Sequence, residues 1–141
     1  MLLLHWTMLW LSLFFYSAPN HNQTKLTITI QNISPVQGKV YVGLYNSKAD
    51  FPKEDKVFQG KVVDVTSAQV SCTFEVPNGN YAVSSYHDKN SNGKLDKNLM
   101  GVPTEAYGFS NNARGTFGPP SFEDAKVVCQ GGTKNIQITL K

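Results

Sequence analysis

From residue 25 onward, apolar and polar residues alternate in short segments, each bounded by Gly, Pro, Asn or Asp. In the segment Lys25 to Gln31, Leu26, Ile28 and Ile30 share one face and the threonines between them share the other. A period of two is the signature of a half-buried β-strand, and no long window has the period of a helix. The segments predicted as strands are 25–31, 39–45, 56–65, 69–76, 81–87, 125–129 and 135–140.

Seven short strands joined mostly by tight links predict an all-β fold with antiparallel pairing. An immunoglobulin-like sandwich suits this count better than a closed barrel, although periodicity alone does not separate the two. Asn78-Gly79 is a hairpin signal, and the segment from Ser47 to Phe51 is compatible with one helical turn capped by Ser47. One stretch breaks the pattern, because the 35 residues from Asp88 to Phe122 contain no clear strand or helix. Loops of that length are uncommon unless they carry a function, bind a metal or are disordered.

The N-terminal segment is expected to direct export. Residues 1–18 carry no charge, and residues 8–16 are almost continuously apolar but shorter than a membrane-spanning helix. We therefore expect a signal peptide over 1–18, a polar tail over 19–24 and a single domain over 25–141, located in the periplasm, on the cell surface or outside the cell. An uncleaved anchor and a misplaced start codon are the alternatives, and the mature form is expected to lack a membrane span.

The composition is that of a folded domain, with 40% hydrophobic and 16% charged residues. The formal net charge of +3 comes from scattered lysines. Because no basic stripe is present, nucleic acid is not expected as a partner.

A long string in the second half of the chain is characteristic: YHDKNSNGKLDKNLMGVPTEAYGFSNN, followed by FGPPSFEDAKV. It resembles the bacterial family of exported domains known as domain of unknown function 2141, and the resemblance runs from about Lys25 to the C-terminus. The resemblance implies a prealbumin-like or immunoglobulin-like β-sandwich behind a signal peptide. It brings no established activity, so no catalytic residue is transferred from it.

The sharpest local motif is D-x-N-x-N-G-x-x-D, which has the ligand spacing of the first part of an EF-hand calcium loop. The bidentate Glu of such a loop is missing, because Leu99 stands in its place, and Glu105 is the nearest substitute. Alternatively, the motif is a series of Asx turns that bond their own backbone. The candidate calcium ligands are Asp88, Asn90, Asn92, the Lys94 carbonyl, Asp96 and Glu105.

Cys72 and Cys129 are the two cysteines of the chain, and each lies in a predicted strand. In an exported protein the simplest expectation is a disulfide between them, and the alternative is a pair of buried thiols.

The segment 107–122 mixes aromatic rings with polar groups of the kind that bind sugars. Tyr107, Phe109, Asn111, Asn112 and Arg114 are therefore candidate ligand residues, although the aromatic rings equally suit a loop folded back on the sandwich. A catalytic role for His87 and Asp88 is a further alternative, but no zinc-ligand spacing, nucleophile elbow or phosphate loop is present. We therefore expect a non-enzymatic extracytoplasmic structural or binding module, with calcium as its one candidate cofactor and an unknown protein or carbohydrate as its partner.

Overall fold

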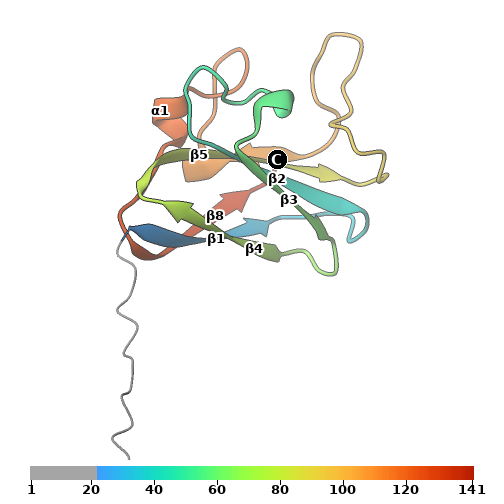
Figure 1. Ribbon diagram of the computed structural model, residues 1–141. Coiled ribbons are helices and arrows are strands. Elements are labelled where there is room, and N and C mark those ends of the chain that lie inside the picture. Colours follow the sequence, from blue (N-terminus) through green and yellow to red (C-terminus); the bar gives the residue numbers. More distant parts are fainter. Residues whose placement is uncertain (1–21) are drawn as a thin grey trace, which may run out of the picture.

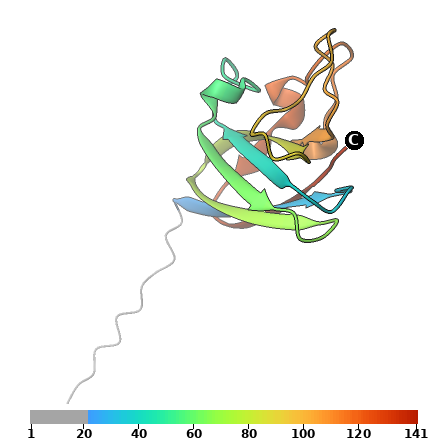
Figure 2. The ribbon, with the colours of Figure 1, turned by 90° about the vertical axis from the view of Figure 1, so that its right-hand side faces the viewer.

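The computed structural model describes residues 22–141, and the predicted export signal and most of the polar tail lie outside the described residues. The described chain is all-β and forms two sheets that lie one above the other (Figures 1 and 2). The smaller sheet has the order β4-β1-β8, and the larger has the order β3-β2-β5-β6 with β7 also paired to β5. The strands are β1 (Gln23–Gln31), β2 (Lys39–Tyr45), β3 (Gln59–Asp64), β4 (Val70–Pro77), β5 (Gly79–Asp88), β6 (Tyr107–Phe109), β7 (Val127–Cys129) and β8 (Gly132–Thr139).

The core lies between the two sheets, and the alternation in the sequence builds it. Along β1, every second residue from Leu26 to Ile30 is fully buried, and Val40, Val42 and Leu44 of β2 face them from the other sheet. Their outward neighbours remain on the outer faces, so the period of two fixes which side of each strand enters the core.

A second, smaller cluster lies on the outer face of the larger sheet. It consists of Tyr45, Phe51, Ala82, Phe109, Phe122 and Ala125. The ring of Phe51 makes edge contacts with Tyr45, Phe109 and Phe122 at centroid distances of 5.3, 5.7 and 6.0 Å. The segments before β3 and before β7 are thereby fastened onto the sheet. The predicted turn after β2 forms as expected, because the Ser47 carbonyl accepts a hydrogen bond from the Phe51 amide at 3.1 Å.

The structure corrects the predicted topology in three respects. The described residues form eight strands, not seven, because the three-residue strand β6 lies inside the predicted long loop. That loop also contains a 3-10 turn, η2 (Ser110–Asn112), and its last residue, Phe122, begins a short helix, α1 (Phe122–Ala125). Pairing is not antiparallel throughout, since β1 and β8 run parallel. The strand predicted over 56–65 begins later, at Gln59, because Lys56 ends a 3-10 turn, η1 (Glu54–Lys56).

The predicted disulfide does not form, and both cysteines are free thiols. Cys129 lies opposite Gly79, just after the turn between β4 and β5, whereas Cys72 lies five residues before the end of β4. Five residues of an extended strand span about 17 Å. The Cα atoms of disulfide-bonded cysteines lie no more than about 7 Å apart. Both thiols face the apolar core, and burial raises the pKa of each.

None of the helices within residues 22–141 is long and apolar enough to cross a membrane.

Candidate functional site

The outer face of the larger sheet carries a row of small residues across three strands. Gly60 of β3 pairs with Gly43 of β2, and Gly43 pairs in turn with Ser84 of β5. A Cβ atom at Gly43 would lie 3.3 Å from a methyl group of Val57 and 3.4 Å from the ring of Tyr45. Because the glycines have no side chains, the backbone of the sheet is uncovered at this point. This part of the sheet forms the floor of a depression.

A row of tyrosines borders this floor on one side. Tyr41 of β2 pairs with Tyr86 of β5, which pairs with Tyr107 of β6, so all three side chains leave the sheet on the same face. The Tyr41 and Tyr86 rings are stacked, with centroids 4.9 Å apart and an angle of 4° between their planes. All three tyrosines are only half-buried, and partial burial raises the pKa of the Tyr86 hydroxyl. Exposed area on these rings is available to a ligand.

The floor and the tyrosines form one side of a groove that we call the tyrosine groove, with a cavity volume of about 660 Å³. Pro52 and Val57 close it on the side of η1, and Leu95, Pro103 and Pro119 border it from two loops. Most of these side chains are apolar, whereas Glu54, Gln59 and Lys97 add polar groups. This volume and this mixture of groups are typical of sites for small molecules.

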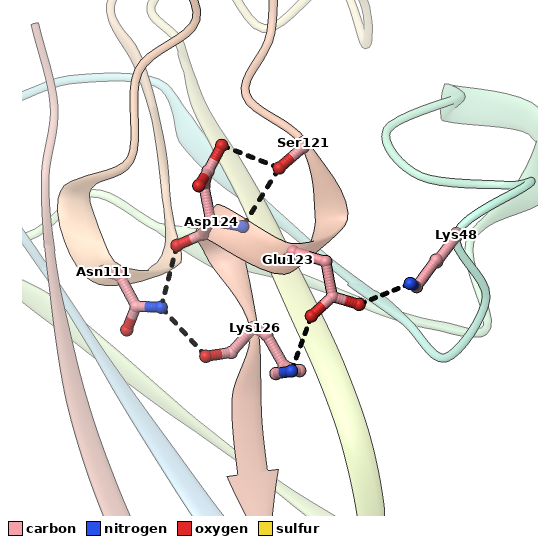
Figure 3. A network of polar contacts seen from close by, with 6 residues as sticks. All are labelled: Lys48, Asn111, Ser121, Glu123, Asp124 and Lys126. Carbon is pink, nitrogen blue, oxygen red and sulfur yellow. Dashed lines mark hydrogen bonds and ion pairs between the residues drawn. The ribbon is translucent and has the colours of Figure 1, made fainter.

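A polar network holds the segment that follows β6 against the rest of the domain (Figure 3). Asn111 donates both of its amide contacts to backbone carbonyls, those of Asp124 and Lys126, at 3.0 and 2.9 Å. Glu123 forms ion pairs with Lys48, which follows β2, and with Lys126. The two lysines hold the pKa of Glu123 at about 2, chiefly through the hydrogen bond from Lys126. The network thus ties the loop beside the groove to the segment that carries its opposite wall.

At one end of the groove lies a second polar assembly, the Asp88 loop, which spans residues 88–105. The buried Asp88 carboxylate accepts hydrogen bonds from the Asn92 and Gly93 amides at 3.1 and 2.8 Å. Asp96 accepts from the side-chain amides of Asn90 and Asn92 at 2.7 and 2.8 Å. These amides, Asn92 first, lower the pKa of Asp96. The loop is therefore ordered by Asx-type hydrogen bonds, as one of the two sequence interpretations expected.

Glu105 closes the Asp88 loop from the far side. Its carboxylate is buried, with only 3% of the residue exposed, and accepts hydrogen bonds from the backbone amides of Lys89 and Asp96, both at 3.1 Å. Glu105 thus lies beside the motif, where it bonds the backbone of the loop. Nevertheless, within residues 22–141 no three His, Cys, Asp or Glu side chains are grouped so that they could hold a metal ion. Calcium binding by this loop stays a prediction.

The family model of the "Uncharacterized protein conserved in bacteria (DUF2141)" family matches residues 28–137. The chain belongs to the DUF2141 family. No curated protein and no solved structure matches it. The match confirms the resemblance seen in the string from Tyr86 to Val127, and it brings no activity with it.

Within the DUF2141 domain, His87 does not face the groove. It pairs across the sheet with Val40, on the face that enters the core, and is 1% exposed. Its Nε2 lies 2.7 Å from the Gln37 carbonyl. His87 and Asp88 are adjacent in sequence, but one is engaged with a loop carbonyl and the other with two loop amides.

Of the five residues of the predicted aromatic ligand face, Tyr107 and Phe109 line the tyrosine groove, and Arg114 lies beside it. Tyr107 belongs to the groove, and the guanidinium of Arg114 lies over its ring at 5.5 Å. Phe109 also belongs to the second cluster, and only 7% of it is exposed. Asn111 supports the backbone beside α1, and the side-chain oxygen of Asn112 accepts a hydrogen bond from the Thr139 amide at 2.8 Å. The two asparagines therefore hold the loop in place.

Sequence reasoning missed the centre of the site, namely Tyr41, Gly43, Ser84 and Tyr86. The signal was present, because Tyr41 and Gly43 alternate with the buried residues of β2. The alternation was used to find the residues of β2 that face the core. The residues on its other face, which line the groove, were not considered.

Proposed function

We propose that this DUF2141 domain is a non-enzymatic extracytoplasmic module that binds a small, mostly apolar molecule in the tyrosine groove. The observation that carries the proposal is the groove itself, with three half-buried tyrosines beside a floor of small residues. Concave, mostly apolar sites with a few polar groups are where small molecules bind, and exposed aromatic area is a common feature of binding sites.

Two features of the groove favour an apolar ligand over a sugar. Its walls are formed mainly by Tyr, Val, Leu and Pro side chains. The Asn111 and Asn112 amides, which would serve a sugar, are engaged with the backbone of the domain. A carbohydrate ligand would have to depend on Tyr107 and Arg114 with the polar groups of the rim.

The contacts of His87 and Asp88 support a binding role over catalysis. A general base must reach the proton that it removes. Here the His87 ring is buried among core residues, and the Asp88 carboxylate already accepts two backbone hydrogen bonds. The uncharged, largely apolar segment 1–18 supports the extracytoplasmic location.

A fluorescent naphthalene sulfonate dye is a suitable first probe, because it is small and mostly apolar. In the variant Ser84→Leu a larger side chain fills the floor, so we expect the affinity of the dye to fall by about tenfold or more. The matched control is Ser71→Leu, the same change on an exposed position of β4 in the other sheet, and it should bind like the wild type. Equal affinities of the two variants would contradict the proposal, and so would tight binding of a neutral oligosaccharide in place of the dye.

A further inference from the structure

Three large apolar side chains stand in the solvent at the tips of two loops. Leu99 and Met100 are 107% and 87% exposed, and Phe117 is 102% exposed. The first two lie at the tip of the Asp88 loop, and the third lies in the loop between η2 and α1. Both loops rise from the larger sheet on the side away from the smaller one, and they point the same way in both views (Figures 1 and 2).

The tip that carries Leu99 and Met100 has a defined backbone. The Asn98 side-chain oxygen accepts hydrogen bonds from the amides of Met100 and Val102 at 2.9 and 3.0 Å. The Asn98 amide donates in turn to the Val102 carbonyl at 2.9 Å, and Lys97 and Pro103 form a bridge below it. Leu99 and Met100 are thus held outward by an ordered turn and have not simply been left out of the core.

The exposed charged side chains around this tip are cationic. Lys89, Lys94 and Lys97 are exposed on the Asp88 loop, and Arg114 is exposed on the second loop. The Asp88 loop also carries three carboxylates, but Asp88 and Glu105 are buried and Asp96 is half-buried, so the fully exposed charged side chains of this loop are its lysines. Glu54 lies on the opposite rim of the groove. The loops therefore present apolar tips among positive charges.

We propose that Leu99, Met100 and Phe117 insert into the interface of a bilayer that contains anionic lipid, while Lys94 and Lys97 contact the head groups. Large apolar side chains beside basic ones are the pattern of interfacial membrane binding, in which buried apolar area and attraction to anionic lipid act together. A folded protein partner is less suited, because a stable interface needs about 800 Å² of complementary surface on each side. Single side chains on two loops do not offer a continuous patch of that kind.

Sedimentation with lipid vesicles tests this proposal on the full chain. We expect the protein to bind vesicles of phosphatidylcholine and phosphatidylglycerol more tightly than vesicles of phosphatidylcholine alone, and less tightly as salt is added. The double variant Leu99→Asp/Met100→Asp should weaken binding by about tenfold or more, since the tips lose their apolar area. Lys94→Gln/Lys97→Gln should remove the preference for phosphatidylglycerol. All variants share residues 1–21, so whatever these residues contribute cancels in the comparison.

The control is Val128→Asp, which places the same charge on an exposed position of β7. It should bind vesicles like the wild type. Unchanged binding by the Leu99→Asp/Met100→Asp variant, with an unchanged melting temperature, would overturn the proposal. So would self-association in analytical ultracentrifugation that the same variant abolishes, because the tips would then serve a second copy of the chain.

Discussion

At the residue scale, Glu123 shows how a surface side chain can hold two segments together. It contacts Lys48 and Lys126 from separate parts of the chain (Figure 3). Exposed ion pairs contribute little individually and are screened by salt. We therefore expect Glu123 to matter chiefly by joining two segments of the chain, because each of these segments leads into one wall of the tyrosine groove.

Glu123 also predicts a pH dependence. Its pKa is lowered in the folded state to about 2 from an ordinary value of 4.5. The contribution of the carboxylate to stability is therefore complete above about pH 4.5 and is lost as the pH falls toward 2. Melting curves of the wild type and Glu123→Gln should differ at pH 7 in low salt and converge as the pH approaches 2. Curves that stay equally far apart over this range would show that the ion pairs do not form in solution.

For the two cysteines, we predict that reduction has no effect on stability. Because both thiols are free and buried to different extents, a reducing agent should leave the melting temperature unchanged. Alkylation of the unfolded, non-reduced protein should modify both Cys72 and Cys129. A mass that shows unmodified cysteines would mean that a bridge forms in spite of the separation of the two strands.

At the element scale, the Asp88 loop shows how buried carboxylates can fix the backbone of a long loop by accepting hydrogen bonds from it. Each oxygen of Glu105 accepts one backbone amide, from Lys89 or from Asp96. In Glu105→Gln one oxygen becomes an NH₂ group that cannot accept, so one buried amide loses its partner. The free energy of unfolding should fall by about 1 to 3 kcal/mol. The control Asp96→Asn, at a carboxylate that accepts only side-chain amides, should cost less in a urea titration.

A third variant of this loop tests the calcium prediction. If Asp88, Asn90, Asn92 and Asp96 bind calcium as the motif predicts, millimolar calcium should raise the melting temperature by a few degrees, because ligands of the native state stabilise it. Asp88→Asn should abolish that shift. An EDTA-treated wild type that melts at the same temperature with and without calcium would contradict the prediction and leave hydrogen bonding as the source of order.

The limits of sequence reasoning are clearest for these elements. Alternation located the longer strands because each places one row of side chains in the core. It could not detect β6, which has only three residues, or the start of β3, which begins at Gln59, three residues after a 3-10 turn. The parallel pairing of β1 with β8 joins strands from the two ends of the domain. Short links predict antiparallel neighbours, but they carry no information about strands so far apart.

At the scale of the whole molecule, the two faces of the larger sheet have separate roles. One packs on the smaller sheet, and the other carries the second aromatic cluster and the tyrosine groove. The hydrogen-bonded structure of the Asp88 loop was predictable, because its motif lies within a few consecutive residues. The groove was not, because it depends on the register that sets Tyr41 beside Tyr86 and Gly43 beside Ser84.

The most direct test of ligand binding in the tyrosine groove is a titration of the isotope-labelled domain with the naphthalene sulfonate dye, followed residue by residue by NMR. We predict saturable shifts in the backbone amides of Tyr41, Gly43, Ser84, Tyr86 and Tyr107, and none along the outer face of β1. Shifts that are absent from these residues, or that fall mainly on the smaller sheet, would contradict the assignment of the tyrosine groove as the ligand site.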